Sequence, residues 1–165
     1  MIATPSWAIW VPVAVVVAAL MEPWAMLLHG MVWHGPLFFM HGSHHAPARG
    51  RFEWNDVLSA LHAPIAIALV LYGCRASPGV AREACFGVGL GMTFFGIAYF
   101  VVHDGFVHGR LRVEFLSKYK YFRRLKVCHQ AHHRVGDARA PYGLFLGFWE
   151  MARARGLRKR RPGSV

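Results

Sequence analysis

The sequence is poor in charged residues, and poorest in acidic ones. Charged side chains make up 16% of the 165 residues, and 8 Asp and Glu stand against 19 Lys and Arg. Soluble domains usually carry roughly 25% charged residues. Because hydrophobic residues make up 55% of the chain, we expect an integral membrane protein, with a very apolar soluble helical domain as the alternative.

Cysteine is also scarce. Cys74, Cys85 and Cys128 show no paired spacing, which argues against a disulfide framework. Lys and Arg are absent before the first apolar run, so the charged start of a secretory signal peptide is missing. We therefore expect this run to remain in the mature protein.

Basic residues concentrate in the second part of the chain. Of the 19 Lys and Arg, 15 lie from Arg110 onward. A basic tail can bind nucleic acid. Here it follows apolar spans, so the usual excess of basic residues on the cytoplasmic side of a membrane explains it more simply. We therefore expect no nucleic-acid partner and a cytoplasmic location for the basic region.

Three apolar runs predict membrane-spanning helices. They are Trp7–Trp33, Val57–Tyr72 and Ala84–Val102. The predicted fold is an all-α membrane bundle, with Leu37–Met40 or Leu144–Trp149 as alternatives for part of a fourth span. We expect Arg110–Val127 to form a helix at the membrane surface. Residues 1–150 would form the membrane-embedded domain and residues 151–165 a basic tail.

Histidine is the residue that stands out. Ten of the 11 histidines fall into four clusters: His29 and His34; His41, His44 and His45; His103 and His108; His129, His132 and His133. Three successive crossings would place all four clusters on one side of the membrane, the basic side. The H-x-x-H-H clusters share one face of a helix. An H-x4-H pair lies roughly 140° apart on an ideal helix, which suits a helix end or two ligands reaching around a metal pair.

Ten imidazoles exceed what one metal ion needs, since a structural zinc takes about four ligands. Two octahedral ions with about five histidines each would keep positions open for oxygen. The sequence therefore predicts a pair of non-haem iron ions that activates O2 and hydroxylates an aliphatic substrate from the bilayer.

Metal-bound histidine usually donates its other N–H to a carboxylate or carbonyl. Asp104 directly follows His103 and is the first candidate for this role, with Glu53 and Asp56 as further ones. Asn55 and Asp56 also precede the second span as a helix N-cap does, which is the favoured interpretation of Asp56.

Two polar residues lie inside predicted spans. Glu22 is the only charged residue of the first span, and a carboxylate at that depth is costly. It either marks a functional site, lies near a membrane interface, or accepts a hydrogen bond from Trp24 or a neighbouring helix. His62 has no clustered partner, and we expect it to be a hydrogen-bonded histidine rather than a ligand.

Three motifs carry a family resemblance. Residues from His41 to Asp56 read H-x-x-H-H-x-P-x-x-G-x-F-E-x-N-D, His103–His108 read H-D-G-x-V-H, and His129–His133 read H-x-x-H-H. These motifs resemble those of the β-carotene hydroxylases, a family within the membrane fatty-acid hydroxylase superfamily. The segment Pro141–Gly147 is similar to one in plant-type members.

The resemblance implies an O2-dependent enzyme that adds a hydroxyl group at C3 of the β-ionone rings of β-carotene, giving β-cryptoxanthin and then zeaxanthin. It implies two iron ions held by the ten clustered histidines, with Asp104, Asn55 and Asp56 behind them. It also implies a carotenoid drawn from membrane lipid and electrons from a ferredoxin-type donor. Plant members have an N-terminal extension and transit peptide, so the resemblance is to the short bacterial form in this respect, and we expect a bacterial inner membrane.

Two other classes of function stay open. One is another oxygenase of the superfamily, acting on an acyl chain or a sterol, or a carotenoid ketolase. The other is a membrane metal-binding or transport protein. Transport sites usually lie near the bilayer midplane, whereas these clusters lie at the ends of spans, so the transporter is less favoured.

Overall fold

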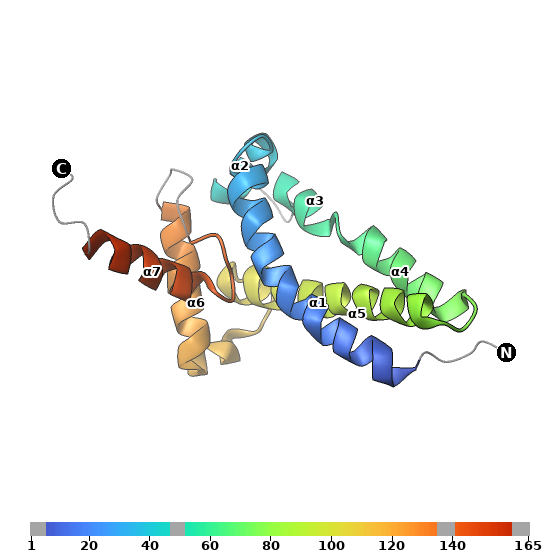
Figure 1. Cartoon of the computed structure of the whole chain (residues 1–165). Helices are drawn as coiled ribbons and strands as arrows, with labels where there is room; N and C mark the ends of the chain where they lie inside the picture. Colours follow the sequence, from blue (N-terminus) through green and yellow to red (C-terminus); the bar gives the residue numbers. More distant parts are fainter. Residues whose placement is uncertain (1–5, 47–51, 135–140, 160–165) are drawn as a thin grey trace.

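The computed structural model describes residues 6–46, 52–134 and 141–159. Pro47, Arg49 and Gly50 of the longest motif lie outside these ranges. Every regular element in them is helical and no strand occurs there, so the predicted all-α fold is confirmed (Figure 1). The elements are α1 (Trp7–Leu27), the π-helix η1 (Leu28–Trp33), α2 (Phe38–His45), α3 (Trp54–Ala60), α4 (Ala63–Arg75), α5 (Val80–Phe100), the π-helix η2 (Val101–Val107), the 3-10 helix η3 (Glu114–Lys118), α6 (Lys120–Arg134) and α7 (Gly147–Lys159).

Three helical segments of the described chain are long and apolar enough to cross a membrane. They are Trp7–Trp33, Trp54–Arg75 and Val80–Val107, which contain the three predicted spans. Neither alternative for a fourth span is long enough, since crossing takes about 20 residues and α2 has only 8. Large side chains such as Val15 and Leu20 are 65% and 60% exposed, as expected where a helix faces lipid.

The second span begins with a capping box and contains a break. Glu53 is the N-cap residue of α3, and its backbone N–H donates to Asp56 Oδ2 at 2.9 Å. The expected capping role of Asp56 is therefore confirmed, although the N-cap residue is Glu53 and not Asn55, because Glu53 and Asp56 cap each other's amides. α3 ends at Ala60, and Pro64 lies in the first turn of α4, where its missing N–H is not needed.

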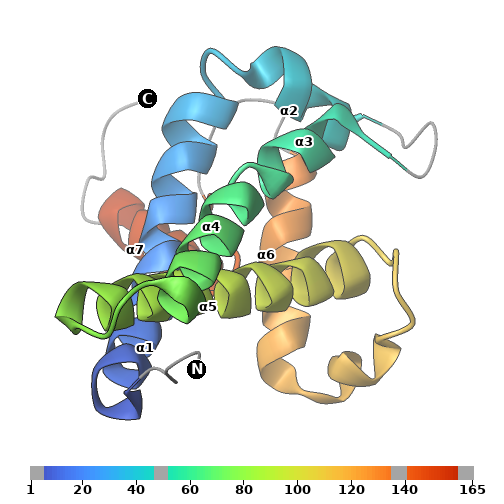
Figure 2. The same cartoon turned by 90° about the vertical axis from the view of Figure 1, so that its right-hand side faces the viewer.

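α5 is the central helix, packed against both α1 and α4 (Figure 2). Glycines allow the close approach to α1. A Cβ atom added at Gly87 would lie 2.6 Å from Trp10 O, and one at Gly91 would lie 2.6 Å from Ala14 O. Small residues four apart are typical of helices that touch closely in a membrane.

We expect Gly91→Ala to destabilise the bundle by about 1–3 kcal/mol, the usual effect of overpacking. The new methyl group would meet a backbone oxygen, which a rotamer change cannot move. Gly96→Ala is the matched control, because a Cβ atom at Gly96 meets nothing within 4 Å. Thermal unfolding of the detergent-solubilised variants measures the difference, and equal unfolding midpoints would show that α1 and α5 are not in close contact.

The basic surface helix, α6, both begins and ends later in the sequence than its predicted range, Arg110–Val127. Gly109, with φ of 72°, turns the chain after η2. η3 follows, and α6 then continues to Arg134, so this helix carries the last histidine cluster itself. Figure 1 shows α6 and α7 at the end of the bundle away from the N terminus. α7 covers Gly147–Lys159 and thus includes part of the predicted tail.

Leucines anchor α6 against the end of the third span. Leu116 of η3, Leu125 of α6 and Leu144 form one buried cluster with apolar residues of η2. Leu125 is only 1% exposed. This cluster fixes the position of α6 relative to η2, and thereby of the histidines on both elements.

Candidate metal centre

The ten clustered histidines lie together where η1, α2, η2 and α6 meet. Their Nε2 atoms face one another, at 2.8–3.2 Å in six pairs. They form two groups in which the ligand nitrogens lie within 4.8 Å of one another. Site 1 contains His29, His34, His41, His45 and His132, and site 2 contains His44, His103, His108 and His129. His133 Nε2 adjoins site 2, 2.8 Å from His129 Nε2.

The two histidines of each H-x4-H pair point to the same site because the chain between them forms a π-helix. His34 N–H donates to His29 O at 2.9 Å, and His108 N–H donates to His103 O at 3.0 Å. This i→i+5 bonding widens the turn and brings residues five apart onto one face. The ring centroids are 5.0 Å apart in the first pair and 4.7 Å apart in the second. Each pair therefore serves a single site.

The two H-x-x-H-H helices instead divide their ligands between the sites. On α2, His41 and His45 contribute to site 1 and His44 to site 2. On α6, His132 contributes to site 1 and His129 to site 2. The i, i+4 pair thus faces one site and the i+3 residue the other, rather than all three facing one point. Both helices bridge the two sites, which couples their positions.

In site 1, neutral oxygens hold the outward-facing ring nitrogens. His29 Nδ1–H donates to Tyr142 O at 2.8 Å. His41 Nδ1–H donates to Asn55 Oδ1 at 2.7 Å, and Asn55 is 2% exposed. These bonds fix the ring orientation and place the free lone pair on Nε2.

In site 2, the corresponding partners are carboxylates. His44 Nδ1–H donates to Glu53 Oε2 at 2.9 Å, and His103 Nδ1–H donates to Asp104 Oδ2 at 3.1 Å. Asp104 and Glu53, two of the candidates for this role, contact imidazoles of site 2, and Asn55 contacts an imidazole of site 1. Asp56 contacts Glu53 N–H and Arg110 instead of a ring.

Each site contains two nitrogens that cannot share a proton. His29 and His41 both donate Nδ1–H outward, so both Nε2 atoms present lone pairs, 3.0 Å apart. His44 and His103 repeat this arrangement at 3.2 Å. Lone pairs this close repel one another unless a cation binds both. The nitrogen donors therefore fit two metal ions, and neutral imidazoles suit iron, zinc or copper.

Desolvation favours the neutral form of five of the clustered histidines. Burial and the neighbouring imidazoles lower the pKa of His34 to about 4 and of His45 to about 3. The same causes lower the pKa of His133 to about 2, and hold the pKa of His44 and His129 well below the usual range. At pH 7 these rings therefore offer lone pairs to a metal ion rather than a positive charge.

Arg110 is a central residue of the site that the sequence analysis missed. Its guanidinium binds Glu53 Oε1 at 3.0 Å, Asp56 Oδ1 at 2.8 Å and Asp104 Oδ1 at 3.0 Å. No motif signals this role, because Arg110 and Asp56 are 54 positions apart. One side chain thus holds both carboxylates that contact site 2.

The segment 141–146 closes site 1. Tyr142 supplies the carbonyl for His29, and the amides of Tyr142 and Gly143 donate to Glu150 Oε2 at 2.8 and 3.1 Å. Leu146 N–H donates to Glu22 Oε1 at 2.9 Å. The carboxylate of the first span therefore accepts a hydrogen bond, as one of the alternatives expected, but from the segment before α7 and not from Trp24 or a neighbouring helix. The segment therefore covers site 1.

His62 lies outside both sites. Its Nε2 accepts a hydrogen bond from Trp24 Nε1 at 3.0 Å, so the expectation of a hydrogen-bonded histidine is met. The bond joins the break in the second span to α1. Both residues line a large cavity next to the histidines.

This cavity, of about 830 Å³, lies between the first, second and third spans. Apolar side chains such as Leu28, Met92 and Phe95 line one part of it, and Asp104, His108 and Arg110 line another. Its volume is in the usual range for small-molecule sites, roughly 300–1,000 Å³. It therefore connects a lipid-compatible interior with the edge of site 2.

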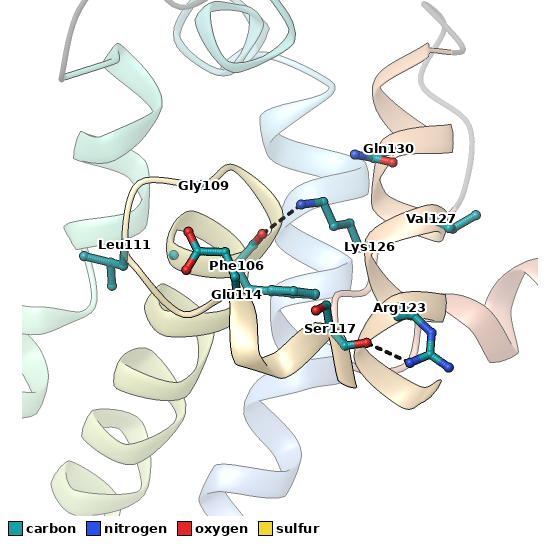
Figure 3. Close-up of a pocket in the computed structure, with 10 residues that line it drawn as sticks. Phe106, Gly109, Leu111, Glu114, Ser117, Arg123, Lys126, Val127 and Gln130 are labelled. Atoms are coloured by element: carbon teal, nitrogen blue, oxygen red, sulfur yellow. Dashed lines mark hydrogen bonds between the residues drawn. The ribbon is translucent and has the colours of Figure 1, made fainter. Parts of the chain in front are cut away.

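A smaller cavity, of about 550 Å³, lies beside η2 and α6 (Figure 3). Lys126, Arg123 and Gln130 approach it from α6, and Glu114 from η3. Lys126 Nζ donates to Phe106 O at 3.1 Å, between the two ligands of η2. The lining of this cavity combines apolar residues such as Phe106 and Leu111 with two basic side chains and one acidic side chain.

Two nitrogen-rich sites at the end of three membrane-spanning helices, beside an apolar cavity, are the features of a membrane metalloenzyme. Residues 14–153 match the fatty acid hydroxylase family, and the chain belongs to this family. No solved structure matches the chain.

Several curated relatives of the chain have names that specify a substrate, which the family description does not. The chain is 46% identical to the chloroplastic β-carotene 3-hydroxylase of Gentiana lutea over 137 residues, which is 83% of this chain and 42% of the relative. It is 46% identical to β-carotene 3-hydroxylase 1 of Arabidopsis thaliana over 136 residues, 82% of this chain and 44% of the relative. A β-carotene hydroxylase of the bacterium Pseudescherichia vulneris is 40% identical over 115 residues, 70% of this chain and 62% of the relative. The chain spans less than half the length of these plant relatives.

Proposed function

We propose that the protein is an O2-dependent membrane hydroxylase that adds a hydroxyl group at C3 of the β-ionone rings of β-carotene, giving β-cryptoxanthin and then zeaxanthin. The observation that carries the proposal is the pair of histidine sites beside an apolar cavity reached from the lipid-facing helices. The names of the relatives support the choice of substrate.

The proposed cofactor is a pair of iron ions, held by His29, His34, His41, His45 and His132 in site 1 and by His44, His103, His108, His129 and His133 in site 2. Bound iron would supply the activation of O2. The net reaction replaces a C–H bond by C–OH and reduces the second oxygen atom to water with two electrons and two protons. The neutral imidazoles would hold the ions without neutralising their positive charge.

The chain's own contribution is to position the ring and exclude water. Trp24, Phe95 and Met92 line the apolar part of the cavity, which suits a hydrocarbon ring and no charged group. The remainder of a long polyene would lie among the exposed apolar side chains of the spans. The end of the ring would then face His108, which lines both the cavity and site 2.

The proposed orientation places the histidines on the cytoplasmic side of a bacterial inner membrane. The basic residues of α6 and the loop before it lie at the same end of the spans as the histidines, which accords with the positive-inside rule. The proposed electron donor is a small acidic protein of the ferredoxin type. Arg123, which lines the smaller cavity (Figure 3), offers complementary charge together with Arg124 and Lys120, which are exposed on the same helix.

Carotenoid analysis in a bacterial host that makes β-carotene tests the proposal. We expect β-cryptoxanthin early and zeaxanthin late after induction. Unchanged β-carotene in cells that contain the iron-loaded protein would contradict the proposed substrate. A ketone product, distinguished from an alcohol by its mass, would identify a ketolase, and hydroxylated acyl chains in the same extract would identify a fatty acid hydroxylase.

A further inference from the structure

Arg110 reaches the metal centre because the chain turns back after η2. Gly109, with φ of 72°, makes the turn, and the backbone N–H of Arg110 then donates to Asp104 O at 2.9 Å. One terminal nitrogen of its guanidinium donates to Asp56 Oδ1 at 2.8 Å and to Asp104 Oδ1 at 3.0 Å. The other terminal nitrogen lies 3.0 Å from Glu53 Oε1. This side chain thus joins the end of the third span to the start of the second.

The two carboxylates that contact site 2 each use one oxygen for a ring and the other for Arg110. Glu53 accepts His44 Nδ1–H on Oε2 and binds Arg110 through Oε1. Asp104 accepts His103 Nδ1–H on Oδ2 and binds Arg110 through Oδ1. A carboxylate held at one oxygen only can rotate about its terminal bond, because this torsion has broad minima. The guanidinium therefore fixes the plane of each acceptor and, through it, the orientation of the ring.

Ring orientation matters because the lone pair of Nε2 lies in the plane of the imidazole. The Nε2 atoms of His44 and His103 are 3.2 Å apart, and one ion can bind both only if both planes are directed at it. Loss of a partner behind a metal-bound histidine typically lowers metal affinity about 10–100-fold. A guanidinium offers several donors in a fixed plane, which an ammonium group does not.

We infer that Arg110 is a positioning residue of the metal centre, which acts through Glu53 and Asp104 on the two rings that they bind. The inference deepens the proposed function: it rests on the proposed iron ions but not on the substrate. Charge alone would have the opposite effect, since a positive charge near a cation weakens its binding. Removal of Arg110 would then strengthen iron binding, whereas loss of positioning weakens it. The sign of the change therefore separates the two explanations.

Competition for Fe(II) between the metal-free protein and a coloured chelator measures this sign. Arg110→Met and Arg110→Lys should each lower the affinity for one of the two ions about tenfold, the lower end of the effect of losing the partner itself. Mössbauer spectra of the 57Fe-loaded variants should show a change in one of the two iron environments. Arg112→Met is the matched control, because Arg112 is exposed in the same loop, and its affinity should equal that of the wild type.

Three results of this experiment would overturn the inference. They are tighter binding by Arg110→Met, wild-type affinity in Arg110→Lys, which keeps the charge, and an equal loss of affinity in Arg112→Met. If Arg110→Met does not fold, Arg110→Lys still gives the answer. A wild type that binds iron but leaves β-carotene unchanged would refute the proposed substrate alone. A wild type that binds no iron would refute the inference together with the proposed cofactor.

A double-mutant cycle tests whether Arg110 acts through a carboxylate. Asp104→Ala removes one of the two acceptors, so less of the effect of Arg110 remains to be lost. The affinity loss in the double variant of Asp104→Ala and Arg110→Met should therefore be smaller than the product of the two single losses, since residues in one network are not additive. A loss equal to that product would contradict the positioning role.

Discussion

Replacing His132 by Ala is expected to remove iron from site 1 and to abolish hydroxylation. His132 is 1% exposed and its Nε2 lies 3.0 Å from that of His34, so no neighbouring side chain or bulk water can take its place without rearrangement. Loss of a direct ligand should exceed the roughly 10–100-fold effect of losing a partner behind one. The same result is expected for His44→Ala at site 2. Metal analysis of the purified variants and carotenoid profiles of their host cells provide the two measurements.

His62→Ala is the control for the metal content of these variants. It is the one histidine outside the four clusters, and it bonds to Trp24 rather than to another imidazole. Its iron content should equal that of the wild type. Full iron and full activity in both His132→Ala and His44→Ala would exclude these residues as ligands.

Gly96→Phe is expected to block the substrate while leaving the metal sites filled. Gly96 lines the large cavity, and a Cβ atom there meets nothing within 4 Å. A phenyl ring would therefore extend into the space assigned to the β-ionone ring without displacing α1 or α4. A shift of the reacting carbon by about 1 Å can lower a rate roughly 100-fold, and exclusion of the ring should lower it further. Carotenoid profiles together with iron content distinguish this effect from loss of the cofactor.

Gly96→Ala serves as the control in this experiment too. Its single methyl group leaves most of the cavity open, so its product yield should remain near that of the wild type. If Gly96→Phe retains full activity and full iron, then the ring does not bind in this cavity. If it loses iron, the cavity and the metal sites are more closely coupled than the structure indicates.

The histidine ligands could be proposed from the sequence because they are concentrated in short motifs. Four clusters that follow three apolar runs lie on one side of the membrane if the runs are spanning helices, and this inference requires no tertiary information. The sequence does not predict which histidines belong to which site. An ideal α-helix separates His29 from His34, and the wider turns of η1 and η2 bring such pairs together. Such π-helices have no reliable local sequence signature.

The residues that contact the outward-facing nitrogens of the ligands also fall into a group that the sequence predicts and a group that it does not. Asp104 could be named because it is adjacent to His103 in sequence. Arg110 and Tyr142 could not, because their roles come from packing between segments far apart, as with His29 and Tyr142, which are 113 positions apart. The predicted start of the surface helix is wrong for a related reason. Charge and aromatic composition predict a surface helix, but they do not predict the turn at Gly109, after which α6 begins only at Lys120.

The central claim is that imidazoles from four segments hold two metal ions side by side. An experimental structure of the iron-loaded protein, with anomalous scattering measured at the iron absorption edge, tests it most directly. The account predicts two anomalous peaks, one among the Nε2 atoms of His29, His41 and His132 and one among those of His44, His103 and His129. A single peak, or peaks away from these nitrogens, would contradict it.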